Sequence, residues 1–249
     1  MATCGEEGSP PQPIVPGLAD ELGGLMSTFG VCAALYAREK TGKGQLVDTS
    51  LMGAAMFAIR MALEAPAMLG QEFPRAVRAR TGNPLWNHYR CKDDKWLVIA
   101  ALQPDRYWPN VCKALGMEEL EHDPRFETLE ARSNNCEELI AIMDRIIASK
   151  AREQWEEIFK REGVLYTLIQ TTTEVINDPQ AIANEYAIWF DHPVFGRTKT
   201  LGFPWKFSNT PCSIRREAPE YGQHAEEILL ELGYNWEDIT KLKEEEVTI

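Results

Sequence analysis

A Gly-Lys-Gly run at positions 42–44 is the first candidate for chemistry, because glycine-rich loops that carry a lysine can hold phosphate groups. A P-loop needs another glycine five residues before the Gly-Lys pair and a serine or threonine directly after the lysine. Ala37 occupies the first of these positions and Gly44 the second. The run is therefore not a nucleotide-binding loop. We interpret it as a tight turn after a helix, whose lysines face either solvent or an anion.

Other residue types that carry chemistry lack the spacing that the chemistry needs. The four histidines are far apart, and none belongs to an HExxH or HxH arrangement, so we predict no metal site. GxSxG and GxGxxG motifs are absent. The six cysteines form no CxxC pair, and we predict that they are buried, reduced thiols: Cys4, Cys32, Cys91, Cys112, Cys136 and Cys212.

The composition is that of a soluble globular protein, with 44% hydrophobic and 26% charged residues in 249 positions. A net charge of −12 argues against sequence-independent binding to nucleic acid or to an anionic membrane. A basic connector that contains Arg75, Arg78 and Arg80 still allows contact with an anionic cofactor. The chain contains no unbroken run of about 18 apolar residues, the length that would predict a membrane span. The N-terminus lacks the basic and then apolar layout of a signal peptide. We predict a cytoplasmic protein.

Helices and strands alternate along the chain. Apolar residues at helical spacing predict a buried helix over 18–41 and a second helix over 51–69, which Pro66 kinks or ends. A short strand is predicted between them, and positions 48–50 cap the second helix. Residues 87–102 predict a hairpin with its turn at Asp93–Asp94, followed by a short amphipathic helix. Further helices are predicted over 133–149, 151–162 and 178–185, then β-structure over 189–211, and two short helices that separate at Gly233.

Residues 18–51 read LADELGGLMSTFGVCAALYAREKTGKGQLVDTSL, and later segments read DPRF, NDPQA, DHPVFG, GFPWKFSNTP and APEYGQHAEEILLELGY. In this order they closely resemble the class III CoA-transferases, the family of formyl-CoA transferase and carnitine CoA-transferase. In that family a D-xx-GG helix leads into AL-xx-R-xx-TG-x-GQ-x-VD-x-SL. The resemblance extends over essentially the whole chain. The matching positions of the first motif are Asp20, Gly23, Gly24, Ala34, Leu35, Arg38, Thr41, Gly42, Gly44, Gln45, Val47, Asp48, Ser50 and Leu51.

The resemblance implies an α/β fold in which part of a Rossmann-like large domain is joined to a small α+β domain, in the architecture of an interlocked dimer. Residues 1–70 are then a remnant of the large domain, 71–205 the small α+β domain with its linkers, and 206–249 a segment that returns to the large domain. Family members are longer than this chain, which resembles only their C-terminal part.

The resemblance also implies a reaction that moves CoA between an acyl-CoA thioester and a carboxylic acid. In the family a catalytic aspartate attacks the thioester to form an aspartyl anhydride, and this aspartate precedes the part that resembles our chain. We therefore expect no catalytic residue here, and we expect a missing N-terminal half or a partner chain to supply it. Coenzyme A is implied as a substrate. We expect neither a permanently bound cofactor nor a metal.

Binding residues for CoA or substrate are implied at several positions. Gly82 and Asn83 lie where the family has a glycine-rich loop over the acyl group, although this loop has fewer glycines. Arg106 matches a position that approaches CoA, where a guanidinium can meet phosphate; the other interpretation is a surface residue at a helix start. Asp20 either lines the cleft or caps the first helix.

Gln103 bears on the choice between a transferase and the related α-methylacyl-CoA racemases. Those enzymes resemble this segment but carry a glutamate near the active site, where our chain reads ALQP. An amide cannot take up or deliver a proton as a carboxylate does, so Gln103 favours a transferase. A racemase relative is one alternative, and a non-catalytic subunit or truncated pseudoenzyme is another. Residues 17–65 predict large apolar faces, so we also expect a homodimer or another obligate oligomer.

Overall fold

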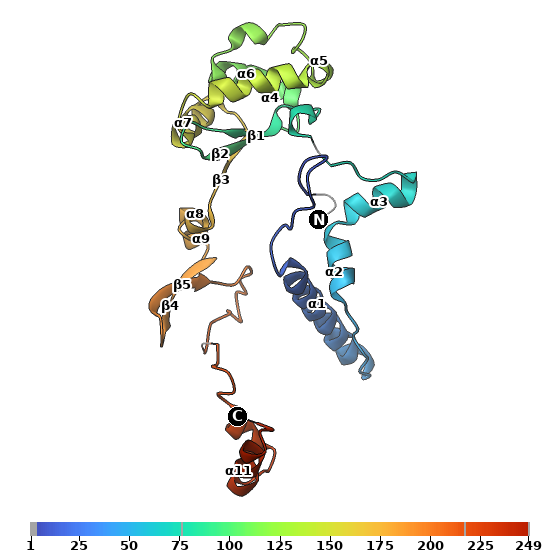
Figure 1. Cartoon of the computed structure of the whole chain (residues 1–249), viewed down its shortest axis with the longest axis vertical. Coiled ribbons are helices and arrows are strands. Elements are labelled where there is room, and N and C mark those ends of the chain that lie inside the picture. Colours follow the sequence, from blue (N-terminus) through green and yellow to red (C-terminus); the bar gives the residue numbers. More distant parts are fainter. Residues whose placement is uncertain (1–3, 76, 217, 249) are drawn as a thin grey trace. The chain divides into compact units, whose positions relative to one another are not determined.

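The computed structural model describes residues 4–75, 77–216 and 218–248. These residues belong to two compact units, one that ends at Ile169 and one that begins at Gln170. In the described residues each unit combines helices with one small antiparallel sheet (Figure 1). The predicted mixture of helix and strand is thus confirmed. The predicted domain boundaries at 70/71 and 205/206 differ from this division and stay a prediction.

The first unit opens with helices α1 (Leu18–Thr41), α2 (Leu51–Ala58) and α3 (Arg60–Leu69). Gly42 ends α1 with a left-handed φ of 71°, so the Gly-Lys-Gly run begins as the predicted turn. The strand predicted after it is wrong, because residues 44–50 are irregular. Ser50 caps α2 as predicted: its Oγ accepts a hydrogen bond from the Gly53 amide at 3.0 Å.

The helix predicted over 51–69 is broken at a different residue from the one expected. Ile59 leaves helical geometry, with φ −104° and ψ 22°, and α2 and α3 meet there at 81°. Pro66 lies inside α3 and does not end it. The prediction that Pro66 ends the helix is therefore wrong.

Helices α1 to α3 present apolar side chains to solvent. Phe29 on α1 is 73% exposed, Met52 on α2 is 74% exposed and Met61 on α3 is 80% exposed. The prediction that the helix over 18–41 is buried is wrong for this chain, since Gly23 is its one buried residue. By length and apolar composition α1 could also cross a membrane, a property that it shares with core helices of globular proteins. These faces are packing surfaces that the described residues leave uncovered.

A three-stranded antiparallel sheet forms the centre of the rest of this unit, with β2 (Trp96–Ala100) between β1 (Trp86–Arg90) and β3 (Tyr166–Ile169). The predicted hairpin is confirmed, and Asp94 takes a left-handed φ of 62° in its turn. Strand β3 was not predicted. It pairs Leu168 with Leu97 of β2, about 70 residues earlier in the chain, which local patterning does not report.

Helices cover one face of this sheet (Figure 1). Besides η1 (Arg78–Arg80), η2 (Glu118–Leu120) and α5 (Leu129–Asn134), this part of the unit contains α4 (Pro104–Leu115), α6 (Cys136–Ile147) and α7 (Arg152–Glu162), which form this cover. Alternation along the strands turns Tyr89, Leu97 and Ile99 towards them, and all three are fully buried. Trp155 and Phe159 of α7 complete this core. On the opposite face, here called the open face, Trp86, His88 and Arg90 of β1 are exposed.

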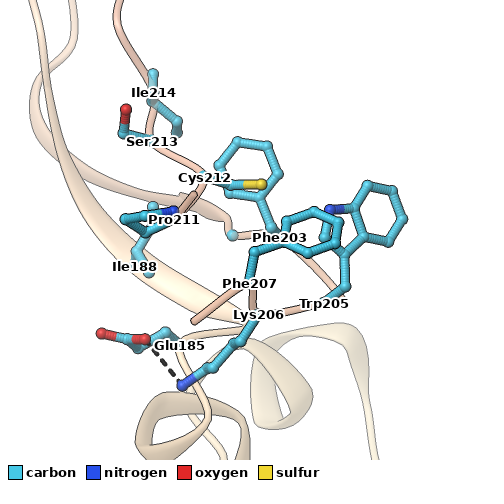
Figure 2. Close-up of a pocket in the computed structure, with 11 residues that line it drawn as sticks. Glu185, Ile188, Phe203, Trp205, Lys206, Phe207, Pro211, Cys212, Ser213 and Ile214 are labelled. Carbon is cyan, nitrogen blue, oxygen red and sulfur yellow. Dashed lines mark ion pairs between the residues drawn. The ribbon is translucent and has the colours of Figure 1, made fainter. Parts of the chain in front are cut away.

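The second unit contains α8 (Thr172–Ile176), α9 (Pro179–Ala183), the hairpin β4 (Ala187–His192) with β5 (Gly196–Leu201), α10 (Ala225–Glu231) and α11 (Trp236–Glu244). The β-structure predicted over 189–211 is confirmed as far as Leu201, and residues 202–211 are irregular. The two short helices that separate at Gly233 are confirmed. Residues 202–214 run beside the base of the hairpin and enclose a cavity of about 300 Å³ (Figure 2). Lys206 Nζ pairs with Glu185 Oε2 at 2.9 Å in its wall.

Gly202 is required at the base of this hairpin. A Cβ atom built on Gly202 would lie 1.9 Å from the carbonyl oxygen of Glu185, which is a backbone atom and cannot rotate away. The Gly202 amide also donates to the Tyr186 carbonyl at 3.0 Å. Only a residue without a side chain allows this close approach.

Candidate active-site wall at Gly82 and the start of α4

The loop of residues 81–83, between η1 and β1, is fastened to the end of β2. Asn83 Nδ2 donates to the Ala101 carbonyl at 3.0 Å, and Asn83 Oδ1 accepts from the Leu85 amide at 3.0 Å. Thr81 Oγ1 donates to the Asn83 carbonyl, also at 3.0 Å. Gly82 at the tip has φ 71°, which glycine adopts without strain. The Asn83 side chain thus holds the loop, and Gly82 is the residue that the loop presents.

Gly82 lines two adjoining grooves, of about 610 and 420 Å³, that share Ser133 and Asn134 at the end of α5. Asn83 and Asp105 also line the larger groove. Hydroxyl, amide and carboxylate groups are part of both walls, among them Ser133, Asn134 and Asp105, so the grooves can form hydrogen bonds with a polar ligand. Across the described ranges, no cluster of three or more histidine, cysteine or acidic residues could hold a metal ion.

The start of α4 adjoins this loop. Gln103 is the N-cap residue of α4, and its side chain makes no capping hydrogen bond. Arg106 is exposed, with its guanidinium carbon 5.5 Å from the centre of the Tyr107 ring. Among the described residues no carboxylate lies within ion-pair distance of Arg106. An uncapped first turn and an unpaired guanidinium together favour an anion at this end of the helix.

A buried arginine holds the same helical turn in place. The Arg132 side chain is fully buried and donates from Nη2 to Asp105 Oδ1. Arg132 Nη1 donates to the carbonyls of Phe126 at 2.7 Å and Glu127 at 3.2 Å. Its guanidinium carbon lies 4.9 Å from the centre of the Trp108 ring. Burial lowers the pKa of Arg132, and the hydrogen bond to Asp105 opposes that shift.

The basic connector does not present free cations. Arg78 binds both carboxylate oxygens of Asp144, at 2.9 and 2.5 Å, and donates twice to the His88 carbonyl. Arg80 Nε donates to Glu137 Oε1 at 2.7 Å. Both acids belong to α6, so these two arginines fasten the connector to that helix. The local excess of arginine has a structural use, which its composition alone did not indicate.

The structure brings four of the five implied binding residues to one edge of the sheet. Gly82 and Asn83 lie beside the end of β2, and Gln103 and Arg106 begin the helix that follows it. Asp20 lies elsewhere, in the first turn of α1. Asp20 is not the cap of that helix, because Gly17 occupies the N-cap position with a left-handed φ of 79°. The capping interpretation of Asp20 is therefore wrong.

Sequence reasoning missed the opposite wall of the grooves. Thr128, Ser133 and Asn134 line it, about 50 residues after Gly82 in the chain. No local motif marks them, and only the packing of α5 against the loop brings them there. The prediction of buried cysteines is correct for Cys91, Cys112 and Cys136, and wrong for Cys32 and Cys212, which are exposed; Cys4 is intermediate.

The sequence matches the family model described as CoA-transferase family III over residues 1–225. The chain belongs to this family. It is 29% identical to an (R)-2-hydroxy-4-methylpentanoate CoA-transferase of Clostridioides difficile, over 97% of the chain and 60% of the relative. It is 27% identical to a cinnamoyl-CoA:phenyllactate CoA-transferase of Clostridium sporogenes, over 98% of the chain and again 60% of the relative.

A solved structure agrees with this assignment. The chain superposes on a CAIB/BAIF family protein from Brucella suis with a TM-score of 0.80 and 27% sequence identity, over 92% of the chain and 59% of that protein. The chain thus spans about 60% of the length of the curated CoA-transferase relatives named above.

Proposed function

We propose that this chain forms one wall of the active site of a CoA-transferase, which moves CoA between an acyl-CoA thioester and a carboxylic acid. Membership of CoA-transferase family III is the observation that carries this proposal. The grooves at Gly82 support it, because the Gly82 backbone and hydrogen-bonding side chains line them. The exposed Arg106 guanidinium at the start of α4 is a further polar contact for a ligand.

The proposed chemistry needs a carboxylate nucleophile. Its oxygen attacks the thioester carbonyl, the CoA thiolate leaves, and a mixed anhydride forms on the enzyme. The thiolate then attacks the enzyme's own carbonyl of that anhydride and releases the donor acid, which leaves CoA on the enzyme. An incoming carboxylate completes the exchange by the same steps in reverse. We propose that another polypeptide segment supplies the nucleophile, which is consistent with a chain that spans 60% of its relatives.

Residues of this chain act on the substrate in two ways. The Gly82 backbone approaches the acyl group, and the Asn83 side chain keeps that backbone in position through its bonds to Ala101 and Leu85. Arg106 and the uncapped start of α4 receive a phosphate of CoA. The neutral amide of Gln103 at this site supports transfer of CoA and disfavours proton abstraction.

The exposed apolar faces of α1 to α3 indicate that another domain or chain packs against them. Exposed Phe29, Met52 and Met61 are surfaces that a folded protein normally covers. We propose that a Rossmann-like large domain covers them, completed by a partner chain or by a second copy in an interlocked dimer. Sedimentation at micromolar concentration tests this: the chain alone should associate, and a single monomeric species would contradict it.

A thioester-exchange assay with hydroxylamine trapping tests the function. The chain alone should form no acyl-enzyme, and exchange should appear when a polypeptide with the N-terminal part of a family member is added. In that mixture Arg106→Gln should raise the KM for acyl-CoA about tenfold, with little effect on the acceptor acid. The matched control is Arg90→Gln, whose arginine already pairs with Asp94.

Three other results would change the assignment. Acyl-enzyme trapped on the chain alone would place the nucleophile in this chain. Exchange of the substrate α-proton with solvent, without CoA transfer, would indicate a racemase. A reassembled complex that binds acyl-CoA and transfers nothing would indicate a pseudoenzyme.

A further inference from the structure

The open face of the three-stranded sheet carries aromatic and apolar side chains. The register pairs Trp86 with Ala100, His88 with Val98 and Arg90 with Trp96, so these side chains share the face opposite to the helices. Trp86 is 49% exposed, although large aromatic side chains usually gain from burial. The His88 and Trp96 rings lie 5.5 Å apart, centre to centre.

A cavity of about 710 Å³ lies against this open face. This volume is in the range of small-molecule pockets. The sheet contributes Trp86, His88 and Val98 to its wall, and Thr81 contributes from the candidate site loop. Thr81 of this cavity and Gly82 of the grooves described above are consecutive residues, so one loop lines both sites. The remaining lining residues are Gly5, Glu6, Arg78 and Asn87.

The charges around the cavity favour an uncharged occupant. Arg78, the cation in its wall, already binds both oxygens of Asp144 and the His88 carbonyl. Burial and the positive charge of Arg78 lower the pKa of His88, so its imidazole is neutral at neutral pH. Glu6 is an exposed acid in the same wall and repels a carboxylate. An apolar group gains contact with the rings and Val98, whereas a carboxylate would lose hydration without a free cation as partner.

We infer that this cavity is the acyl pocket of the proposed site, and that it takes the apolar side chain of the transferred acid, binding aromatic or branched side chains better than short ones. This inference rests on the proposed function. In it Trp86 and Val98 determine specificity, and the thioester group lies at Gly82, where the walls become polar. The acid is thus oriented with its side chain on the sheet and its carbonyl towards the groove.

Binding of two small neutral thioesters tests the pocket without turnover. The probes are the N-acetylcysteamine thioesters of 3-phenylpropanoic acid and of acetic acid, which lack the nucleotide part of CoA. The phenylpropanoyl probe should shift the NMR signals of the His88 and Val98 amides, and the acetyl probe should leave them nearly unchanged. Trp86→Ala should weaken binding of the phenylpropanoyl probe about tenfold, the loss expected for one aromatic contact.

Two further variants make the result decisive. Trp189→Ala is the matched control, because Trp189 is also exposed, at 59%, and lies on β4 of the second unit; it should bind both probes like the parent chain. Val98→Phe should block the pocket from the neighbouring strand and keeps the inference testable if Trp86→Ala does not fold. Equal binding of the two probes, or equal affinity in the Trp86 and Trp189 variants, would overturn the acyl pocket.

The two proposals fail in different ways. Probe binding at Trp86 together with an inactive reassembled enzyme would reject the transferase function and keep an apolar thioester-binding cavity. Active exchange with no probe binding at Trp86, and with unchanged acyl preference in Trp86→Ala, would reject the pocket and keep the function.

Discussion

Arg132 gives the sharpest test of what holds the candidate site together. Its side chain is fully buried, yet it carries a charge at every accessible pH. Asp105 and the carbonyls of Phe126 and Glu127 receive its hydrogen bonds. Arg132→Met keeps much of the volume and leaves both carbonyls without this donor. Loss of one member of a buried ion pair costs about 3–5 kcal/mol, and the exposure of Asp105, at 65%, places this case at the lower end.

Arg125 provides a matched control within the same module. It also pairs with two acids, Asp123 at 2.6 Å and Glu138 at 2.5 Å, and its guanidinium carbon lies 5.0 Å from the Phe126 ring. Its side chain is 50% exposed, however, so solvent screens those pairs. The two substitutions therefore compare the same residue type and similar partners in two environments.

Hydrogen exchange of peptides from α4, α6 and α7 measures the stability of this module directly. About 3 kcal/mol corresponds to a hundredfold or greater loss of protection in Arg132→Met, because each 1.4 kcal/mol is a factor of about ten. Arg125→Met should change protection by no more than about fivefold. Similar losses in the two variants would refute the argument that burial makes the Arg132 network essential. Arg132→Lys should recover only part of the protection, since an ammonium cannot reach all three oxygens in the planar geometry of a guanidinium.

Three further outcomes follow from named contacts. Burial raises the pKa of the Cys112 thiol to about 12. Iodoacetamide at about pH 8 should therefore label the exposed Cys212 in the native chain and label Cys112 only in denaturant. Rapid labelling of Cys112 in the native chain would contradict its burial. Gly202→Ala should destabilise the β4–β5 hairpin by about 1–3 kcal/mol, because the new Cβ clashes with the Glu185 carbonyl. Gly24→Ala should instead stabilise α1 by about 0.5–1 kcal/mol, because no atom lies within 4 Å of the new Cβ. Thermal unfolding and hydrogen exchange measure both effects. The hydrogen bond from Lys95 lowers the pKa of Glu153 to about 2, from an ordinary 4.5. The Glu153 carboxylate therefore stabilises the fold above pH 4.5 and loses that effect as the pH falls towards 2. In low salt, Glu153→Gln should make the hydrogen-exchange protection of α7 less dependent on acid pH, and an unchanged pH profile would argue against this pair.

Elements with local sequence signals could be predicted without any tertiary information. Apolar residues at helical spacing, together with the glycine-containing turn at Gly42, predict a helix over 18–41 that is observed. Alternation on either side of the Asp93–Asp94 turn predicts the β1–β2 hairpin. These features depend on residues a few positions apart, so the chain encodes them before any tertiary contact forms.

The candidate site could be located from the sequence only in outline. Gly82, Asn83, Gln103 and Arg106 were implied by the family resemblance, and the structure places them at one sheet edge. The role of each residue could not be predicted. The sequence does not show whether the Asn83 amide faces a ligand or, as in the structure, donates to the Ala101 carbonyl. The exposed face at Trp86 was not predicted, because Trp86 precedes the predicted hairpin and the helices that decide which face is covered come later in the chain.

Tertiary structure alone decided the long-range features. Strand β3 exists because Leu168 pairs with Leu97, and Arg132 is structural because its chain position meets Asp105 across 27 residues. Apolar periodicity in α1 to α3 specified that these helices need a covering surface, since exposed apolar area is unfavourable in water. It could not specify which surface that is, because hydrophobic attraction is non-directional and only shape and geometry select the partner.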